Sequence, residues 1–235
     1  MIPLPDVLFE DENLLAINKP AGVLTIQDGY DAEKPYLSRM LSEHYGRLWV
    51  VHRLDRDTSG VLLFARNPQT HRALSLQFEH RQVKKIYHLI TFGNLPQEEV
   101  EVNLPLKVNA DRRHRTLVDD LRGKPASTIF RILQPLDRGF LLLEAQPLSG
   151  YTHQIRAHLS TLGLQILGDE LYKPHPLPPN RPIYPLPPDS PATPRIALHA
   201  FALSFHHPWL PEKEITLMAP YPSDFVSLLE SLKPK

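Results

Sequence analysis

Short apolar runs recur along the chain and are bounded by Gly, Pro, Asn or charged residues. Runs of this kind are typical of strands. They alternate with a few amphipathic segments, and no internal repeat is found. The pattern therefore predicts a chain of mixed α and β structure. The expected strands are Leu14–Asn18, Val61–Ala65, Ile86–Phe92, Thr128–Leu133, Phe140–Ala145, Ile196–Phe205 and Glu214–Met218.

Other segments carry apolar residues at helical spacing, and their flanking residues are typical of helix ends. Gly46 is placed to end the first helix and Asn67 to cap the second. Ser223 is placed to cap a short C-terminal helix that starts at about Asp224. The residues that define the other three helices are Tyr36, Leu37, Met40, Leu41 and His44; Ala73, Leu74 and Phe78; and Ile155, Leu159 and Leu162.

A proline-rich window interrupts this pattern between Pro174 and Pro194, where ten of the chain's 25 prolines lie. Proline lacks the amide donor and clashes with a helical neighbour, so the window predicts neither a helix nor a central strand. A linker between two domains and a ligand for an SH3-type module are two interpretations. The roughly 40 residues that follow are too few to fold alone, which favours a long surface loop that returns to the same core.

Composition narrows the chemistry that the chain can carry. It has no cysteine, which excludes disulfides, thiolate metal sites and cysteine nucleophiles. Lys and Arg total 26 and so do Asp and Glu, so affinity for a polyanion requires a local basic patch. No apolar run approaches the roughly 20 residues of a membrane span, and the first residues do not resemble a signal peptide. We expect a cytoplasmic protein without a membrane partner.

The segment His52–Gly60, HRLDRDTSG, has the densest mixture of opposite charges in the chain. It lies between two apolar stretches, a position at which functional loops are common. One interpretation is a solvated turn in which Asp57 and Thr58 bond to nearby backbone. The other is a reactive carboxylate, because Arg53 and Arg56 would hold Asp55 ionised and oriented. Composition alone favours the solvated turn.

This segment resembles the signature of the RluA-type pseudouridine synthases, which reads H-R-L-D-x-x-T-S-G. Every fixed position of that signature is present. Further segments are similar to those of the family in the same order, so the resemblance spans roughly residues 8 to 228. They are NKPAGVLT at Asn18–Thr25, KIYHLITFG at Lys85–Gly93, GYTHQIRAHLSTLG with ILGDELY at Gly150–Tyr172, LHAFALSFHHP at Leu198–Pro208 and APYPSDF at Ala219–Phe225.

The resemblance implies an α+β fold: a single catalytic domain over residues 1–235, built on a largely antiparallel mixed sheet with a central cleft. The family usually carries an N-terminal S4-type RNA-binding module or begins directly with the catalytic domain, and we expect no such module here because only about seven residues precede the first strand-like block. We expect residues 174–194 to form a surface excursion from the domain. The implied activity is that of an isomerase that converts uridine in ribosomal or transfer RNA to pseudouridine. That reaction requires no cofactor and no metal, and we expect the protein to act as a monomer.

The family's site residues map onto this sequence one by one. Asp55 matches the catalytic aspartate, which either attacks ribose C1′ or removes the 2′ proton. Arg156 matches the basic residue that pairs with it. Tyr87 matches the tyrosine that stacks on the target base and assists proton removal from C5. Arg53 matches the arginine that takes the place of the flipped nucleotide. Without the resemblance, Tyr87 is an ordinary strand aromatic and Arg156 a solvated helix residue.

Two further features concern RNA and metal binding. The densest basic run contains Lys107, Arg112, Arg113, His114 and Arg115, and a second run contains Arg81, Lys84 and Lys85; we expect the first, above all Arg112, Arg113 and Arg115, to contact RNA. His153 and His158 lie five residues apart and His206 and His207 are adjacent, so neither pair has the spacing of metal ligands on one face.

Tyr151 departs from the family, which has arginine at this position of G-R-T-H-Q-I-R. The loss of this cation puts one contact to RNA in question, although tyrosine can stack or donate a hydrogen bond.

Two other functions fit part of the sequence. A noncatalytic RNA-binding protein on the same fold is the main alternative, but it has no use for Asp55, Tyr87 and Arg156 together. A glycosidase or nucleosidase with Asp55 and Asp57 as its carboxylate pair is the other. The flanking arginines would keep both carboxylates ionised, which leaves no general acid.

Overall fold

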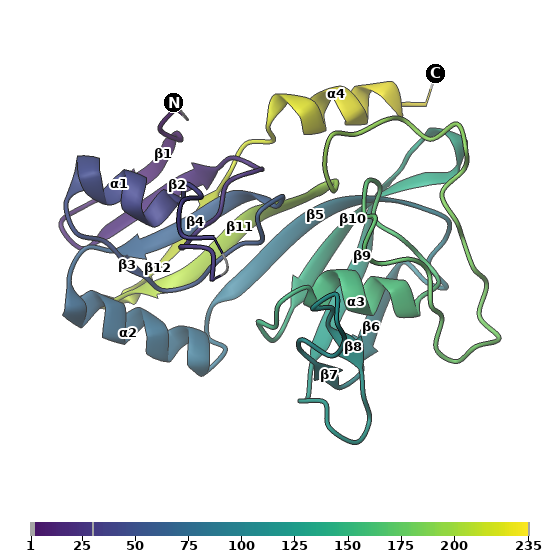
Figure 1. Ribbon diagram of the computed structural model, residues 1–235, viewed down its shortest axis with the longest axis horizontal. Coiled ribbons are helices and arrows are strands. Elements are labelled where there is room, and N and C mark those ends of the chain that lie inside the picture. The colour runs from purple at the N-terminus through teal and green to yellow at the C-terminus, as the bar shows by residue number, and fades with distance from the viewer. Residues whose placement is uncertain (1–2, 30, 235) are drawn as a thin grey trace. The chain divides into compact units, whose positions relative to one another are not determined.

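The computed structural model describes residues 3–29 and 31–234, and the chain forms two compact units (Figure 1). The first unit comprises Met1–Lys85 and His199–Pro222, and the second comprises Ile86–Leu198 and Ser223–Lys235. Because each unit is built from two separated stretches of chain, neither is a contiguous piece of sequence. The expectation of one catalytic domain over residues 1–235 stays a prediction.

The first unit is a sheet with two helices. Its strands run in the order β1-β2-β4-β11, with β3 on β4 and β12 on β11. All of these pairs are antiparallel except β4 with β11. The elements are β1 (Val7–Glu10), β2 (Leu14–Lys19), α1 (Leu37–Tyr45), β3 (Trp49–Val50), β4 (Ser59–Ala65), α2 (Pro68–Glu79), β11 (Leu198–His207) and β12 (Leu210–Met218).

Burial explains this arrangement. Every residue of β4 is buried, and alternate residues of β2 and β4, such as Leu14 and Leu63, pack with β11, β12 and α2 in one apolar cluster. The predicted helix ends are confirmed here. Gly46 follows α1, and the Asn67 side chain accepts a hydrogen bond from the Thr70 N–H at the start of α2, with Pro68 in the first turn.

The second unit contains an antiparallel sheet in the order β5-β10-β9-β6 and a separate two-stranded pair, β7-β8. Its elements are β5 (Lys84–Phe92), β6 (Glu99–Asn103), β7 (Leu106–Lys107), β8 (Leu117–Val118), β9 (Ser127–Pro135), a 3-10 turn (Asp137–Gly139), β10 (Phe140–Pro147), α3 (Gln154–Thr161) and α4 (Ser223–Ser231). The expected α+β class with a largely antiparallel mixed sheet is confirmed.

Most strands extend beyond their predicted bounds, as β4 (Ser59–Ala65) and β12 (Leu210–Met218) do. Two other boundaries also differ from the sequence prediction. Ile196 and Ala197 precede β11 rather than starting it, because the Ala197 amide bonds to Leu167 and its carbonyl to Ile90. Helix α4 includes Ser223, which we expected to be its cap. Residues 174–194 contain neither helix nor strand.

Candidate active-site residues

Residues 52–58 of the signature segment form the loop between β3 and β4 in the first unit, and Ser59 and Gly60 are the first residues of β4. Asp55 is half-buried, Arg53 and Asp57 are exposed, and Thr58 and Ser59 are buried. The Thr58 N–H donates to the Asp55 carbonyl at 3.2 Å, which closes a turn directly after the aspartate. The loop therefore carries a half-buried Asp55 side chain on a backbone that is held by the turn and by the buried residues after it.

Lys19, the last residue of β2, holds this backbone. Its side chain is fully buried, and Nζ donates to the carbonyl oxygens of Pro20, Arg56 and Thr58, each at 2.9 Å. An ammonium group has three donors, and here each has a backbone partner. The Gly22 N–H also donates to the Arg56 carbonyl, at 2.9 Å. Lys19 thus joins the turn that follows β2 to the loop that carries Asp55.

A histidine fixes the start of the loop. Nε2 of His52 accepts a hydrogen bond from the Leu63 N–H at 3.0 Å, and the imidazole stacks on Phe78 with ring centroids 4.9 Å apart. Burial, with a smaller contribution from the Lys85 charge, lowers the pKa of His52 to about 3. His52 is therefore neutral at physiological pH, as its acceptor role requires.

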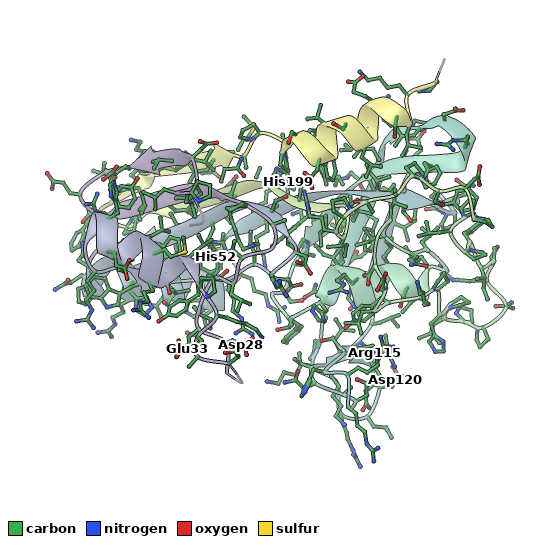
Figure 2. All side chains as sticks on the ribbon, turned by 45° about the horizontal axis from the view of Figure 1, so that its top comes forward. Asp28, Glu33, His52, Arg115, Asp120 and His199 are labelled. Atoms are coloured by element: carbon green, nitrogen blue, oxygen red, sulfur yellow. The ribbon has the colours of Figure 1, made fainter. Side chains whose placement is uncertain are left out.

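A second histidine, His199, is fully buried and fixes the end of the loop; it and His52 are labelled in Figure 2. His199 on β11 lies 3.1 Å from the Ala219 carbonyl through Nε2 and 2.9 Å from the Ser59 hydroxyl through Nδ1. Because a carbonyl only accepts, Nε2 carries the proton and Nδ1 accepts from Ser59. The next residue, Gly60, has φ +119°, and a Cβ there would lie 2.1 Å from the Ala200 oxygen. The Ser-Gly pair of the signature is thus required where β4 meets β11.

The other predicted site residues lie in the second unit. Tyr87 is half-buried on β5, opposite Ala145 of β10. Arg156 lies on α3 and forms a bidentate ion pair with Asp169, with both N–O distances at 2.7 Å. The Asp169 side chain is 1% exposed and that of Arg156 is 13% exposed. The expected pairing of Arg156 with Asp55 stays a prediction.

Asp169 is a residue that the sequence prediction missed. One of its carboxylate oxygens also accepts hydrogen bonds from the Leu171 and Tyr172 N–H groups, at 2.9 and 3.0 Å. The Arg156 guanidinium carbon lies 4.8 Å from the centroid of the Tyr172 ring. The signal was an acidic residue within the apolar stretch ILGDELY, where a carboxylate needs a partner.

Tyr172 extends this polar group. Its hydroxyl oxygen accepts from the Thr116 N–H at 2.6 Å and lies 3.1 Å from Nδ1 of His153. Burial raises the pKa of Tyr172 to about 12. Tyr151, where the family has arginine, packs against the apolar cluster of Leu106, Ala126, Ala157 and Tyr172. The substituted side chain therefore contributes to packing in this unit.

The turn that joins β7 to β8 carries the predicted RNA-binding arginines, and a second turn follows β8. Arg112 and Arg113 are exposed. Arg115 instead forms an ion pair with Asp111 at 2.6 Å, which leaves it less available to a phosphate. Asp111 also accepts from the Arg113 and Arg115 N–H groups, and these bonds lower the pKa of its carboxyl. Arg115 and Asp120 mark the two turns in Figure 2.

His158 has a structural environment. It lies 2.8 Å from the Thr128 hydroxyl and 3.0 Å from the Leu104 carbonyl, and burial lowers its pKa to about 4. Within residues 3–29 and 31–234, no three acidic or histidine side chains group as metal ligands would. No helix in that part of the chain has the length and apolar content that a membrane span requires.

Comparison with known proteins decides the family. Residues 13–161 match the sequence profile of RNA pseudouridylate synthase. The chain belongs to the RNA pseudouridylate synthase family. Within it, the resemblance to the RluA type is confirmed: the chain is 34% identical to the dual-specificity RNA pseudouridine synthase RluA of Pasteurella multocida, over 88% of this chain and 89% of that protein.

Two further similarities support the assignment. The chain is 33% identical to the ribosomal large subunit pseudouridine synthase D of Zymomonas mobilis, over 98% of this chain and 73% of that protein. Human RNA pseudouridylate synthase domain containing 4 superimposes with a TM-score of 0.73 at 25% identity, covering 96% of this chain and 92% of that one. The expected isomerase class is confirmed, and the noncatalytic alternative is not favoured.

Proposed function

We propose that this chain isomerises specific uridines of ribosomal or transfer RNA to pseudouridine and that Asp55 is its catalytic aspartate. The observation that carries the proposal is the complete signature at His52–Gly60, folded so that buried groups hold the backbone around a half-buried carboxylate. A reactive group must be held in a fixed orientation, and this loop is held at its start, middle and end.

The reaction consists of a rearrangement within one nucleotide. The bond between ribose C1′ and uracil N1 breaks, the uracil turns, and C5 bonds to C1′; the C5 proton is lost and N1 gains one. Asp55 acts at the sugar, either as the nucleophile at C1′ or as the base for the 2′ proton. Tyr87 stacks on the uracil and assists removal of the C5 proton, and Arg156 supplies positive charge that orients the carboxylate.

RNA binding is assigned to exposed cations. Arg53 is exposed on the signature loop and is proposed to replace the flipped nucleotide in its stack. Arg112 and Arg113 contact phosphates, and Arg115 supports their turn through its ion pair with Asp111. The name of the Zymomonas relative, a ribosomal large subunit pseudouridine synthase, favours ribosomal RNA as one substrate. We expect a cytoplasmic monomer that needs no cofactor or metal.

The test compares pseudouridine maps of total RNA from cells with and without the gene, and adds purified protein to RNA from the deleted strain. We expect one or a few positions to disappear on deletion and to return with purified protein, also after dialysis against EDTA. Identical maps with and without the gene, together with no modification by the purified protein, would contradict the proposal. RNA binding without modification would support the noncatalytic alternative.

A further inference from the structure

The proline-rich segment 174–194 has no regular secondary structure, but its backbone is hydrogen-bonded to other parts of the second unit, to which it belongs. It is the long loop between α3 and β11 in Figure 1. The His175 N–H donates to the Ser160 carbonyl at 2.8 Å, and the Leu177 N–H donates to the Thr161 carbonyl at 2.9 Å. Further along, the Tyr184 N–H donates to the Gly163 carbonyl at 2.9 Å.

These three acceptors lie at and just beyond the C-terminal end of α3. The last carbonyls of a helix have no partner within the helix, and a buried helix end needs partners from elsewhere. Helix α3 has only eight residues, and seven of them are buried, so its ends matter for its stability. Ten residues of the segment are prolines, which have no backbone N–H. The three residues that face these carbonyls, His175, Leu177 and Tyr184, are not prolines and can donate.

Side-chain packing follows the same path. A Cβ on Gly93 would lie 2.4 Å from the Tyr184 ring, and a Cβ on Gly163 would lie 2.0 Å from the Pro182 oxygen. Both glycines have positive φ as well, +118° and +79°. The segment is therefore packed against the backbone at the end of β5 and at the end of α3.

The segment's far end contacts the loop that carries Asp169. A Cβ on Gly168, the residue before Asp169, would lie 2.6 Å from Cγ2 of Thr193 in the segment and 2.3 Å from the oxygen of Arg195, the residue directly after the segment. Arg195 itself is held by a bidentate pair with Asp224, at 2.6 and 3.0 Å. The segment thus meets both elements that carry the Arg156–Asp169 ion pair: the helix of Arg156 and the loop of Asp169.

We propose that residues 174–194 form a strap that positions α3, and through it Arg156, and that Tyr184 is the positioning residue at its centre. This inference rests on the proposed function of Arg156. A free ligand for an SH3-type module is disfavoured, because Pro176 is buried and the segment's backbone is already hydrogen-bonded to α3. These contacts also indicate that the segment packs against the second unit's core elements and contributes to their stability.

The test uses Tyr184→Ala, with Ile183→Ala as the matched control, because Ile183 is 57% exposed. We expect Tyr184→Ala to slow the single-turnover rate at saturating RNA about tenfold, while the Kd for RNA changes less than threefold. Hydrogen exchange of the α3 amides should speed up. Tyr184→Phe, which keeps the ring on Gly93, and Ile183→Ala should both behave like the wild type.

A double-mutant cycle separates positioning of Arg156 from a general loss of structure. In an Arg156→Lys background, Tyr184→Ala should cost less than twofold in rate, because its effect passes through Arg156. An equal loss in both backgrounds, or a Tyr184→Ala rate equal to that of Ile183→Ala, would overturn the proposal. If Tyr184→Ala does not fold, Tyr184→Leu replaces it in the same cycle.

Failure of the proposed function gives a different result. In that case the wild type makes no pseudouridine in the same assay, whereas hydrogen exchange of α3 still reports whether the strap holds the helix. Unchanged exchange of α3 in Tyr184→Ala overturns the strap whatever the activity.

Discussion

Two kinds of loop in this molecule are held in opposite ways. The signature loop is fixed by buried groups from outside it: Lys19 binds its carbonyls and His199 binds Ser59. The turns next to β7 and β8 are held by their own carboxylates, Asp111 and Asp119, each of which accepts from backbone N–H groups nearby. The first arrangement suits a group that must react in one geometry, and the second suits exposed cations that adapt to an RNA surface.

Removal of the Lys19 ammonium group should have the largest effect on stability of the variants proposed here, because this group holds the signature loop. Lys19→Met keeps the length of the side chain but removes the donor to three carbonyls, of which that of Arg56 keeps a second donor, the Gly22 N–H. We expect a loss of about 3–5 kcal/mol in the free energy of unfolding, together with a large loss of activity. A denaturant melt measures the first, and a single-turnover assay the second.

Lys84→Met is the matched control, because Lys84 is exposed at the start of β5. It should change the free energy of unfolding by less than about 0.5 kcal/mol. If the two variants are equally stable, Lys19 does not hold the loop.

Acid should weaken the structure through two histidines with lowered pKa values: the half-buried His52 beside the fixed loop and the buried His158 in the second unit. Their pKa values are lowered to about 3 and about 4 in the folded protein, from 6.5. The unfolded chain therefore binds protons that the folded chain does not, and stability is lost as pH falls below 6.5. For His52 alone we expect a loss of about 3 kcal/mol between pH 7 and pH 4.

Melts across this pH range test the sign and the source of the effect. His52→Gln should flatten the pH dependence, because an amide oxygen can still accept from Leu63 but does not titrate there. His80→Gln, at an exposed position, should leave it unchanged. A wild type that is equally stable at pH 4 and pH 7 contradicts the assignment of a neutral His52.

Substitutions in the exposed turn between β7 and β8 should have the smallest effect on stability. Arg112→Ala with Arg113→Ala should change the free energy of unfolding by less than about 0.5 kcal/mol, because both side chains are exposed. RNA affinity should fall about tenfold, and the slope of log Kd against log salt should decrease by about 2. The control is Arg39→Ala with Arg72→Ala, which removes the same charge from α1 and α2. Its slope of log Kd against log salt should lie nearer to that of the wild type than the slope of the Arg112 and Arg113 variant does.

Much of the fold followed from the hydrophobic pattern, because strongly apolar elements leave a clear signal. Each expected strand overlaps an observed strand, and β4 is buried at every residue. The strands that the pattern missed are short or polar. In β6, for example, only Val102 is buried and both glutamates are exposed. Two valines are too few apolar residues to give a clear alternation of apolar and polar positions.

The candidate site was predictable by residue type and much less by contact. The signature identified Asp55, but nothing local in the sequence indicates that Lys19 Nζ reaches Arg56, 37 residues away. The bond between Ser59 and His199 spans 140 residues. Main-chain bonds such as that from Leu177 to Thr161 involve no particular side chain and so leave no signature. Long-range partners and backbone contacts therefore required the structure.

The central claim is that Asp55 performs chemistry while RNA is held elsewhere, and one substitution tests it most directly. Asp55→Asn changes a carboxylate to an amide of the same shape, and Asp57→Asn makes the same change at an exposed position two residues along the loop. Pseudouridine formation in single turnover and the Kd for RNA are measured for both. We predict no product above background for Asp55→Asn with a Kd within about tenfold of the wild type, and near wild-type rates for Asp57→Asn. Turnover by Asp55→Asn close to the wild-type rate would contradict the account.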